Sequence, residues 1–366
     1  MNLRIATFNM ENLFTRPAAM QEGVGAKGQQ AIDDHAELNS IIAKDVYSDH
    51  DKARLLKLEP RYRFAELSPP TNALVRLNKV RGQLFKRTQA SVKSVAAMGR
   101  ASWTGWFELR TDDVVWMATY NTGRVVAEAN ADIIICVEVE NRPTLQRFNE
   151  QVLGAKLNCE YPHVMVLDGN DQRGIDVGIM SRYPISGIRS HVDDRNPNGE
   201  RTFSRDCPEY VVELNDGKRI AVIPNHFKSK RGGDSPAAKA KRLAQASAAS
   251  AIAKRALEIS PYVVLGGDLN DTPASDSLKP LFLDGFQDVQ THASYPTDRP
   301  GTFDTGTAGN KIDYLILSEK LHEALQATGV ERRGSYHPNT WTPFDTVKKK
   351  ADEASDHHLV WANFTL

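Results

Sequence analysis

The stretch that decides the fold is residues 263–271, VVLGGDLND, in which a short apolar run ends in two glycines and then in polar side chains. A short Val/Leu run that is closed by Gly-Gly is typical of a buried β-strand, which here would leave its sheet at Asp268. Asp268 and Asn270 then lie just beyond the strand. A single carboxylate at this position is most often a turn or helix cap, so Asp268 alone does not identify a site.

The same pattern of an apolar run with polar side chains at one end recurs along the chain. The side chains concerned are Asn9, Glu138, His226, Asp313, Asp356 and His357. Their carboxylate and amide oxygens are the ligands that Mg²⁺ or Mn²⁺ prefers, and no Cys/His spacing favours zinc. Together with Asp268 and Asn270 they predict one site at the ends of several strands, containing a hard cation and two histidines.

Short β-branched or alternating runs predict the strands, and longer runs with Ala, Lys and Arg predict the helices. The expected strands are residues 3–8, 132–137, 163–167, 175–181, 210–214, 219–224, 262–265, 312–317 and 359–364, and the expected helices are 122–130, 143–153 and 236–259. Residues 215–218, NDGK, favour a hairpin turn. Many strands interrupted by a few helices predict an α/β fold of two packed sheets with helices outside them.

Residues 16–116 do not show this alternation of strand and helix signals. We interpret them as an insertion with patchy helical signals at 36–44 and 74–84. Between Lys52 and Arg110 there are 13 Lys or Arg but only three acidic residues, although the whole chain has 46 of each. A basic segment favours a polyanionic partner. The aromatic residues Tyr62, Phe64, Phe85, Trp103, Trp106 and Phe107 are interleaved with these cations. Rings and cations together suit nucleic acid, but a solvated basic face over a small aromatic core is an equal alternative.

The N-terminus is too soon interrupted by polar residues to be a signal peptide, and no run of roughly 18 apolar residues predicts a membrane helix. A cytoplasmic location without a membrane partner is therefore the default expectation. The three cysteines have no metal-type spacing.

The ordered set of motifs resembles the endonuclease/exonuclease/phosphatase superfamily, which includes DNase I, exonuclease III, sphingomyelinases and inositol polyphosphate phosphatases. The motifs are TFNMEN at 7–12, EVEN at 138–141, DVGIMSR at 176–182, NHFKS at 225–229, GGDLND at 266–271, IDY at 312–314 and SDH at 355–357. They cover residues 1–14 and about 118–366 in the order of the family. The resemblance implies one catalytic domain over 1–366, folded as a DNase I-like four-layer sandwich of two mixed sheets flanked by helices. The largely helical insertion departs from it.

The resemblance also implies roles for the residues at the strand ends. Metal ligands for Mg²⁺ or Mn²⁺ would be Asn9, Glu138 and Asp356, and catalytic residues would be His226, Asp268, Asn270, Asp313 and His357. In this assignment Asp268 and Asn270 orient the attacking water, and His357, held by Asp313, meets a phosphoryl oxygen. His226 is a general acid or a transition-state donor. Candidates for substrate binding are Arg173, Arg205, Lys228 and Lys230. For the two arginines the alternative is a surface ion pair with a nearby acid.

Three functions remain open at this point. The first is a metal-dependent nuclease that cuts DNA or RNA, which the basic insertion and the lysines after His226 favour. The second is a phosphatase or phosphodiesterase that acts on a small phosphorylated molecule or a lipid headgroup. The third is a non-catalytic binding protein that kept the fold, which the completeness of the motifs makes the weakest of the three.

Overall fold

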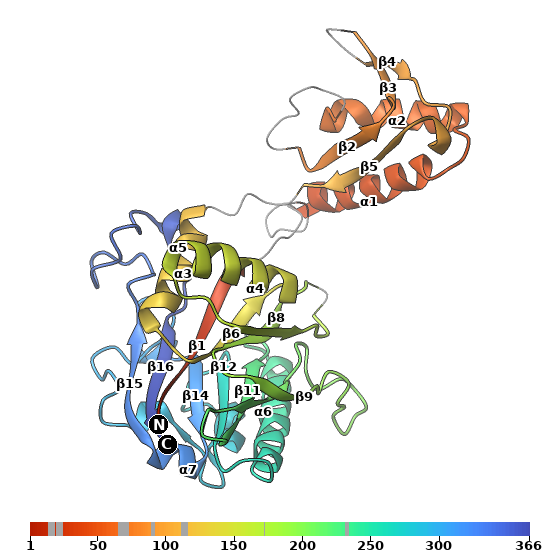
Figure 1. The fold of residues 1–366 in the computed structure, drawn as a ribbon. Helices are drawn as coiled ribbons and strands as arrows, with labels where there is room; N and C mark the ends of the chain where they lie inside the picture. Colours follow the sequence, from red (N-terminus) through yellow and green to blue (C-terminus); the bar gives the residue numbers. More distant parts are fainter. Residues whose placement is uncertain are drawn as a thin grey trace. The chain divides into compact units, whose positions relative to one another are not determined.

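The structure is a computed structural model that describes residues 1–13, 19, 25–64, 73–88, 92–110, 116–171, 173–230 and 234–366. The chain divides into two compact units (Figure 1). The first unit consists of Met1–Phe14 and Val114–Leu366, and the second of Thr15–Asp113. Almost the same segment was expected as an insertion, so the first unit carries all the candidate site residues.

Two six-stranded sheets form the centre of the first unit within the described residues. One sheet contains β1 (Asn2–Leu13), β6 (Ile133–Val139), β7 (His163–Leu167), β8 (Asp176–Ser181), β15 (Leu325–Glu331) and β16 (Leu359–Thr365), in the order β15-β16-β1-β6-β8-β7. The other contains β9 (Ile185–Arg189), β10 (Glu209–Glu213), β11 (Arg219–His226), β12 (Val263–Asp268), β13 (Gln287–Asp288) and β14 (Asp313–Leu317), in the order β13-β14-β12-β11-β10-β9. Both sheets are mixed, because β1 and β6 are parallel, as are β11 and β12, whereas the other pairs are antiparallel.

Three layers of apolar packing arrange these elements as a four-layer sandwich. Ile135 of β6 and Val264 of β12 belong to the buried cluster between the sheets. Helices α3 (Trp116–Ala129) and α4 (Arg142–Phe148) pack on the outer side of the first sheet, and α6 (Pro236–Ala256) packs on the outer side of the second (Figure 1). The expected fold class is therefore confirmed. No helix in the described part of the chain is both long and apolar enough to cross a membrane.

Strand β6 shows how the fold presents a carboxylate. Ile133, Ile135 and Val137 face the cluster between the sheets, whereas Ile134 and Cys136 face the helices. The alternation breaks at Glu138, where the register against β8 shifts, and Glu138 adopts a left-handed backbone conformation with φ of 60°. Such a conformation is uncommon for residues other than glycine, and a bulge of this kind re-aims a side chain next to a site. The Glu138 side chain therefore leaves the strand where the sheet ends.

Every strand expected from the sequence for the first unit is present, with ends within a few residues of those predicted. The hairpin at 215–218 is also confirmed, because the Leu214 N–H donates to the Lys218 carbonyl at 2.8 Å and Gly217 has a φ of 81°. Strands β9, β13 and β15 were missed. β9 contains a central glycine, β13 has two residues, and the β15 sequence LQATGVE does not alternate.

The second unit is less helical than expected. It contains α1 (Gly25–Ile42) and α2 (Asp49–Tyr62), followed by β2 (Val75–Arg81), β3 (Phe85–Arg87), β4 (Val92–Val95) and β5 (Thr104–Leu109). The expectation of a helix at 74–84 is wrong, since most of this range is β2. Its residue Leu77 pairs with Phe107 of β5, a partner some 30 residues away that a local pattern does not reveal.

The aromatic residues of the second unit mostly form its core. Tyr62, Phe64, Phe85, Trp103 and Phe107 are all buried in one apolar cluster. Trp106 differs, because 46% of it is exposed. The structure thus favours the small aromatic core for most of these rings, and Trp106 is the one of the six that is exposed.

Candidate active site

The strands that carry the candidate residues end at a common edge. β11, β12 and β14 lie side by side, and His226, Asp268 and Asp313 occupy directly paired positions across them. In the other sheet, Asn9 of β1 pairs with Val137 of β6, directly before Glu138. The Asn9 amide reaches Asp268 at 3.3 Å, so the edges of the two sheets meet at one site.

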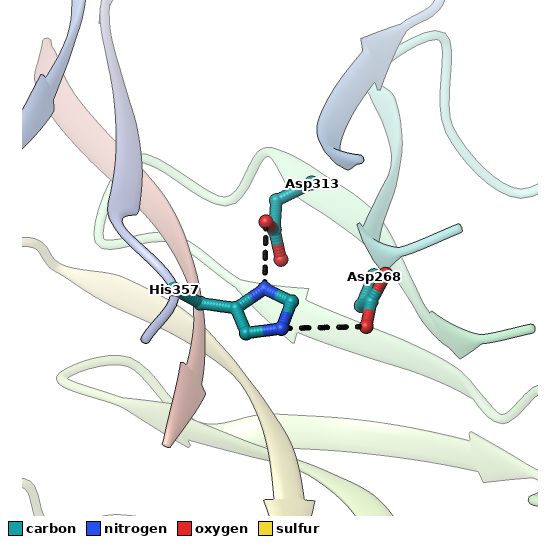
Figure 2. Close-up of side chains that lie close together, drawn as sticks. All are labelled: Asp268, Asp313 and His357. Atoms are coloured by element: carbon teal, nitrogen blue, oxygen red, sulfur yellow. Dashed lines mark hydrogen bonds and ion pairs between the residues drawn. The ribbon is translucent and has the colours of Figure 1, made fainter. Parts of the chain in front are cut away.

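His357 lies between two carboxylates in this site (Figure 2). Its Nδ1 is 2.9 Å from Oδ2 of Asp313, and its Nε2 is 3.9 Å from Oδ2 of Asp268. One ligand atom from each of these three buried residues lies within 4.8 Å of the others. The Thr302 hydroxyl donates to the same Asp313 oxygen at 2.7 Å and accepts from the Asp313 N–H at 2.9 Å. Asp313 is thereby fixed in the orientation that holds the His357 ring.

The surrounding carboxylates decide the charge of His357. Burial by itself would lower the pKa of its imidazole, but Asp313 at hydrogen-bonding distance, with Asp268 and Asp356 nearby, raises that pKa well above its ordinary value. The carboxylates around His357 therefore favour its imidazolium form.

His226 has the opposite character. Its Nε2 lies 3.6 Å from Asp268 and 3.8 Å from Glu138, and its Nδ1 is buried without a hydrogen-bond partner among the described residues. Burial, reinforced by the positive charges of Arg205 and His357, lowers the pKa of His226 well below its ordinary value. The surroundings thus favour the neutral form of His226 and the charged form of His357.

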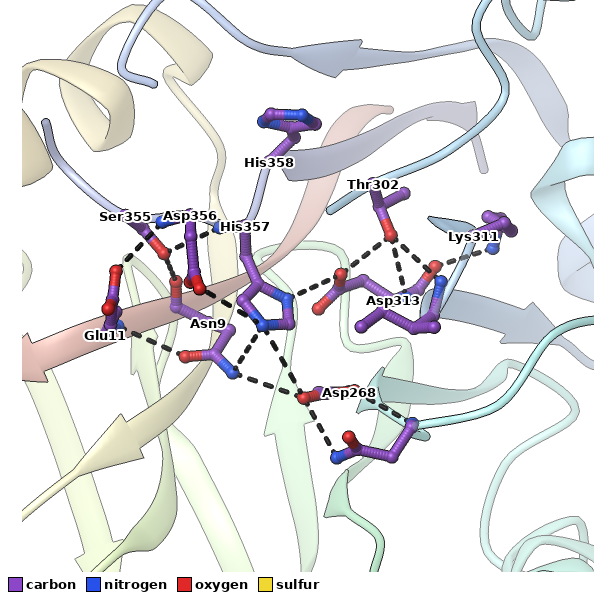
Figure 3. A network of polar contacts seen from close by, with 12 residues as sticks. Asn9, Glu11, Asp268, Thr302, Lys311, Asp313, Ser355, Asp356, His357 and His358 are labelled. Atoms are coloured by element: carbon purple, nitrogen blue, oxygen red, sulfur yellow. Dashed lines mark hydrogen bonds and ion pairs between the residues drawn. The ribbon is translucent and has the colours of Figure 1, made fainter. Parts of the chain in front are cut away.

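Asp268 is at the centre of the polar network (Figure 3). Its Oδ1 accepts from the backbone N–H of Asn270 at 2.8 Å, and its Oδ2 accepts from the Asn270 amide at 3.1 Å. Asn270 makes these bonds from a left-handed conformation with φ of 54°. Burial raises the pKa of Asp268 to about 7, with the effect of His357 opposing it and Asp313 adding to it. A carboxylate of this kind exchanges its proton near neutral pH, as a general base must.

Two of the expected metal ligands lie close to the histidines: Oδ1 of Asp356 is 3.9 Å from Nε2 of His357, and Oε1 of Glu138 is 3.8 Å from Nε2 of His226. Figure 3 shows Glu11 beside Asn9, and the Asp356 N–H donates to the Glu11 carboxylate at 2.9 Å. Burial raises the pKa of Asp356 to about 7, and the neighbouring Glu11 and Glu138 oppose its ionisation further, although His357 favours it. The Asn9 amide oxygen accepts only the Glu11 N–H among the described residues, at 3.2 Å.

The donor set fits a hard divalent cation. Glu11 and Glu138 lie close enough to Asp356 to add to the effect of burial in raising the pKa of its carboxyl, which is the situation that a bound cation relieves. Oδ1 of Asp313 is buried with no hydrogen-bond partner within the described ranges. Glu11 is the residue that sequence reasoning missed. The signal was available, because Glu11 lies two positions after Asn9 on the same strand and so shares its face.

The four substrate candidates differ in their surroundings. Arg205 is buried, and its Nε lies 3.0 Å from Asp171. Burial lowers the pKa of Arg205, while Asp171, Glu138 and Asp268 act in the opposite direction. The Arg205 guanidinium therefore interacts electrostatically with carboxylates of the candidate site. Arg173 is exposed and pairs with the same Asp171 at 2.8 Å. The alternative of a surface ion pair therefore describes Arg173, whereas Arg205 pairs with the same carboxylate but is buried.

The two lysines are less directly connected with the site. Lys230 forms an ion pair with Asp271, which also accepts from the buried Arg242 at 2.9 Å. The Lys228 N–H donates to Gln245 at 2.9 Å, and its side chain is half-buried. Lys230 would have to leave Asp271 before it could hold a phosphate.

A buried polar cluster fixes the loop that carries Arg205. The His191 ring lies 2.7 Å from both Asp194 and Glu209, and Arg255 also donates to Glu209. The His191 N–H donates to Asp206, the residue next to Arg205, at 2.8 Å. Burial would lower the pKa of His191, but the two carboxylates raise it above its ordinary value of 6.5.

This cluster makes a pH-dependent contribution to stability. The pKa of His191 is higher in the folded state than in the unfolded state. The contribution of protonated His191 to the free energy of unfolding is therefore complete below about pH 6.5, and it is lost as the pH rises through the folded-state pKa. Replacing His191 with Gln should therefore lower the free energy of unfolding by about 1–3 kcal/mol at pH 6 and by less at pH 9, as measured by urea denaturation. The exposed His50, replaced with Gln, serves as the control. An equal loss at both pH values would contradict the role of the imidazolium.

Comparison with known proteins supports the family resemblance. The Endonuclease/Exonuclease/phosphatase family profile matches residues 118–357. Similar solved structures include TDP2 from Caenorhabditis elegans, at 17% identity over 68% of this chain and 90% of that one with a TM-score of 0.47. The endonuclease/exonuclease/phosphatase from Bacteroides vulgatus (17%, 69% and 91%, 0.48) and beta toxin from Staphylococcus aureus (19%, 67% and 92%, 0.46) are also similar. No curated protein matches the chain.

Proposed function

The chain belongs to the endonuclease/exonuclease/phosphatase family, and from this premise we propose that it is a Mg²⁺- or Mn²⁺-dependent phosphodiesterase that hydrolyses DNA or RNA. Family and fold indicate a hydrolytic phosphoesterase. The observation that carries the proposal is the alignment of His226, Asp268 and Asp313 across three neighbouring strands, with His357 held between the two aspartates. This arrangement brings together a base (Asp268), a charged hydrogen-bond donor (His357) and a neutral hydrogen-bond donor (His226).

The cation would be held by Glu138, Asp356 and Asn9, with Glu11 beside them. When bound, it neutralises charge on the phosphate and lowers the pKa of a water molecule. Within the chain itself, Asp268 takes the proton from the attacking water, because its pKa is about 7 and its carboxylate is fixed by two bonds from Asn270. The Asn9 amide, which donates to Asp268, keeps this carboxylate in place from the other sheet.

The histidines act on the phosphoryl group. The His357 imidazolium donates from Nε2 to a phosphoryl oxygen and stabilises the charge that develops there, while Asp313 holds the ring through Nδ1. His226, being neutral, donates a hydrogen bond from Nε2 on the side of Glu138. The buried Arg205 adds positive charge to the site. Because it is shielded from bulk water, its attraction to a phosphate is stronger than that of an exposed arginine.

A panel of substrates tests the proposal. Purified protein with Mg²⁺ or Mn²⁺ is incubated with supercoiled plasmid, single-stranded DNA, RNA, an inositol phosphate series and sphingomyelin vesicles. Cleavage of a nucleic acid by the wild-type protein, lost in Asp268→Asn, is the expected result. Turnover confined to the inositol phosphates or to sphingomyelin would replace the nuclease by the small-molecule or lipid alternative. The absence of any hydrolysis would favour the non-catalytic alternative.

A further inference from the structure

Some cations of the helical part of the second unit are neutralised within it. On α2, Arg61 forms an ion pair with the buried Asp34, and Arg54 pairs with Glu37 at 2.7 Å. Lys44, just after α1, pairs with Asp51 at 2.6 Å. The exposed Lys27 and Lys57 form no ion pair with a described residue, so this pairing removes only part of the positive charge of the helices.

The strands of the unit keep their positive charge available. The exposed cations on β2, β3 and β4 form what we call the strand surface: Lys79, Arg81, Lys86, Arg87 and Lys93. None of these five forms an ion pair with a described residue, whereas Arg76, earlier on β2, is paired with Glu108 at 2.8 Å. Four of the five lie within nine residues of sequence, on either side of a bend.

A bend follows Arg81. Gly82, between β2 and β3, has a φ of 72°, and a Cβ placed on it would lie 2.7 Å from the Ser102 carbonyl. Only glycine combines this conformation with this close approach. Lys86 and Arg87 follow a few residues later on β3, which pairs with β4 and not with β2.

Trp106 lies on the same sheet face as one of these cations. In the β2–β5 ladder, Leu77 and Phe107 form one pair and point into the core. The alternate residues therefore point outward, and Trp106 is opposite Asn78 on that face. The next residue of β5 on this face, Thr104, is paired with Arg81. The exposed Trp106 and Arg81, which has no ion pair with a described residue, thus lie two ladder pairs apart, with a register shift of β2 between Lys79 and Arg81.

We propose that the strand surface and Trp106 bind single-stranded nucleic acid without sequence preference, with the cations on backbone phosphates and the indole stacked on a base. The inference rests on the proposed function for its choice of nucleic acid as ligand. Charge complementarity requires a polyanion, and a flat exposed ring beside cations suits the unstacked bases of a single strand. Paired bases in a duplex present only edges and leave the indole no stacking partner.

The test is binding to labelled oligonucleotides by fluorescence anisotropy, with the full chain in EDTA so that no turnover occurs. The main variant replaces Lys79, Arg81, Lys86 and Arg87 with Gln. Each phosphate contact contributes about −0.7 to the log–log salt dependence on a single strand, so the slope should become less steep by about 2 to 3. The matched control removes four exposed cations of the first unit, Lys156, Arg219, Lys279 and Lys320, and should keep the wild-type slope.

A second pair of variants tests the stacking. Trp106→Ala should weaken binding to single-stranded DNA by about tenfold or more, and Trp106→Tyr should restore most of it, because a ring can again stack on a base. Duplex affinity should change little in either. Equal losses on single strand and duplex would overturn the single-strand assignment, and a wild-type salt slope in the quadruple Gln variant would overturn the surface itself. Vesicles of anionic phospholipid that outcompete the oligonucleotide would identify a membrane ligand and overturn the proposal.

These outcomes separate the inference from the proposed function. If the wild-type protein hydrolyses nucleic acid but the strand-surface variant binds it normally, the inference fails and the proposed function stands. If the protein binds single strands through the strand surface but cleaves none of the nucleic acids in the panel, the proposed activity fails and the surface stands.

Discussion

Replacing His357 with Ala should lower kcat for phosphodiester hydrolysis by about 10²- to 10⁴-fold, with little change in KM. The His357 ring is the charged donor of the site, and its Nε2 faces Asp268 where a phosphate would be attacked. The loss should fall on kcat, because the imidazolium meets charge that develops only in the transition state. Steady-state kinetics on a chromogenic phosphodiester measures both constants.

Asp313→Asn separates orientation from chemistry. It should be milder than His357→Ala, and it should move the alkaline limb of the kcat/KM profile to lower pH, because Asp313 is a main cause of the raised pKa of His357. His358→Gln is the matched control, since this neighbouring histidine points away from the site toward the Asp304 carbonyl, 3.0 Å from its Nε2 (Figure 3). Wild-type kcat in His357→Ala would remove the assignment.

Removing divalent cations should abolish hydrolysis, and Glu138→Gln should weaken Mn²⁺ binding by about tenfold or more. Glu138 contributes a carboxylate beside Asp356. The pKa of the Asp356 carboxyl is about 7 in the absence of a metal cation. Binding of Mn²⁺ near pH 7 should therefore release protons. Isothermal titration calorimetry in buffers of different ionisation enthalpy measures the affinity and the proton release independently of activity.

The exposed Glu213 on β10, changed to Gln, is the matched control for the loss of one carboxylate. It should leave both the affinity and the proton release unchanged. Full hydrolysis in EDTA, or Mn²⁺ binding by Glu138→Gln with wild-type affinity, would exclude the metal mechanism.

The sequence by itself determined most strands of the first unit, although not β9, β13 or β15, and the residues at their ends. A strand buried on both faces must be apolar along its length, so residues 132–137 and 263–265 stand out without any knowledge of their neighbours. A single polar side chain after such a run is most often a cap, but the recurrence of the pattern at several strand ends points to one site. Asn9, Glu138 and Asp268 could therefore be predicted to lie together from the recurring pattern and the family resemblance, as could the two-sheet fold. Glu11 carried the same signal, two positions after Asn9, and was overlooked.

Only the tertiary structure decided the properties that depend on which elements become neighbours. The histidines look equivalent in the sequence, yet Asp313 and Asp268 raise the pKa of His357 against the effect of burial, whereas burial, reinforced by Arg205, lowers the pKa of His226. The second unit shows the same limit. There, β2 pairs with β5, so the expected helix at 74–84 is mostly a strand. Most aromatic rings of the second unit are buried, whereas Trp106 is exposed. Protonation and exposure depend on contacts between distant residues, which a local pattern does not contain.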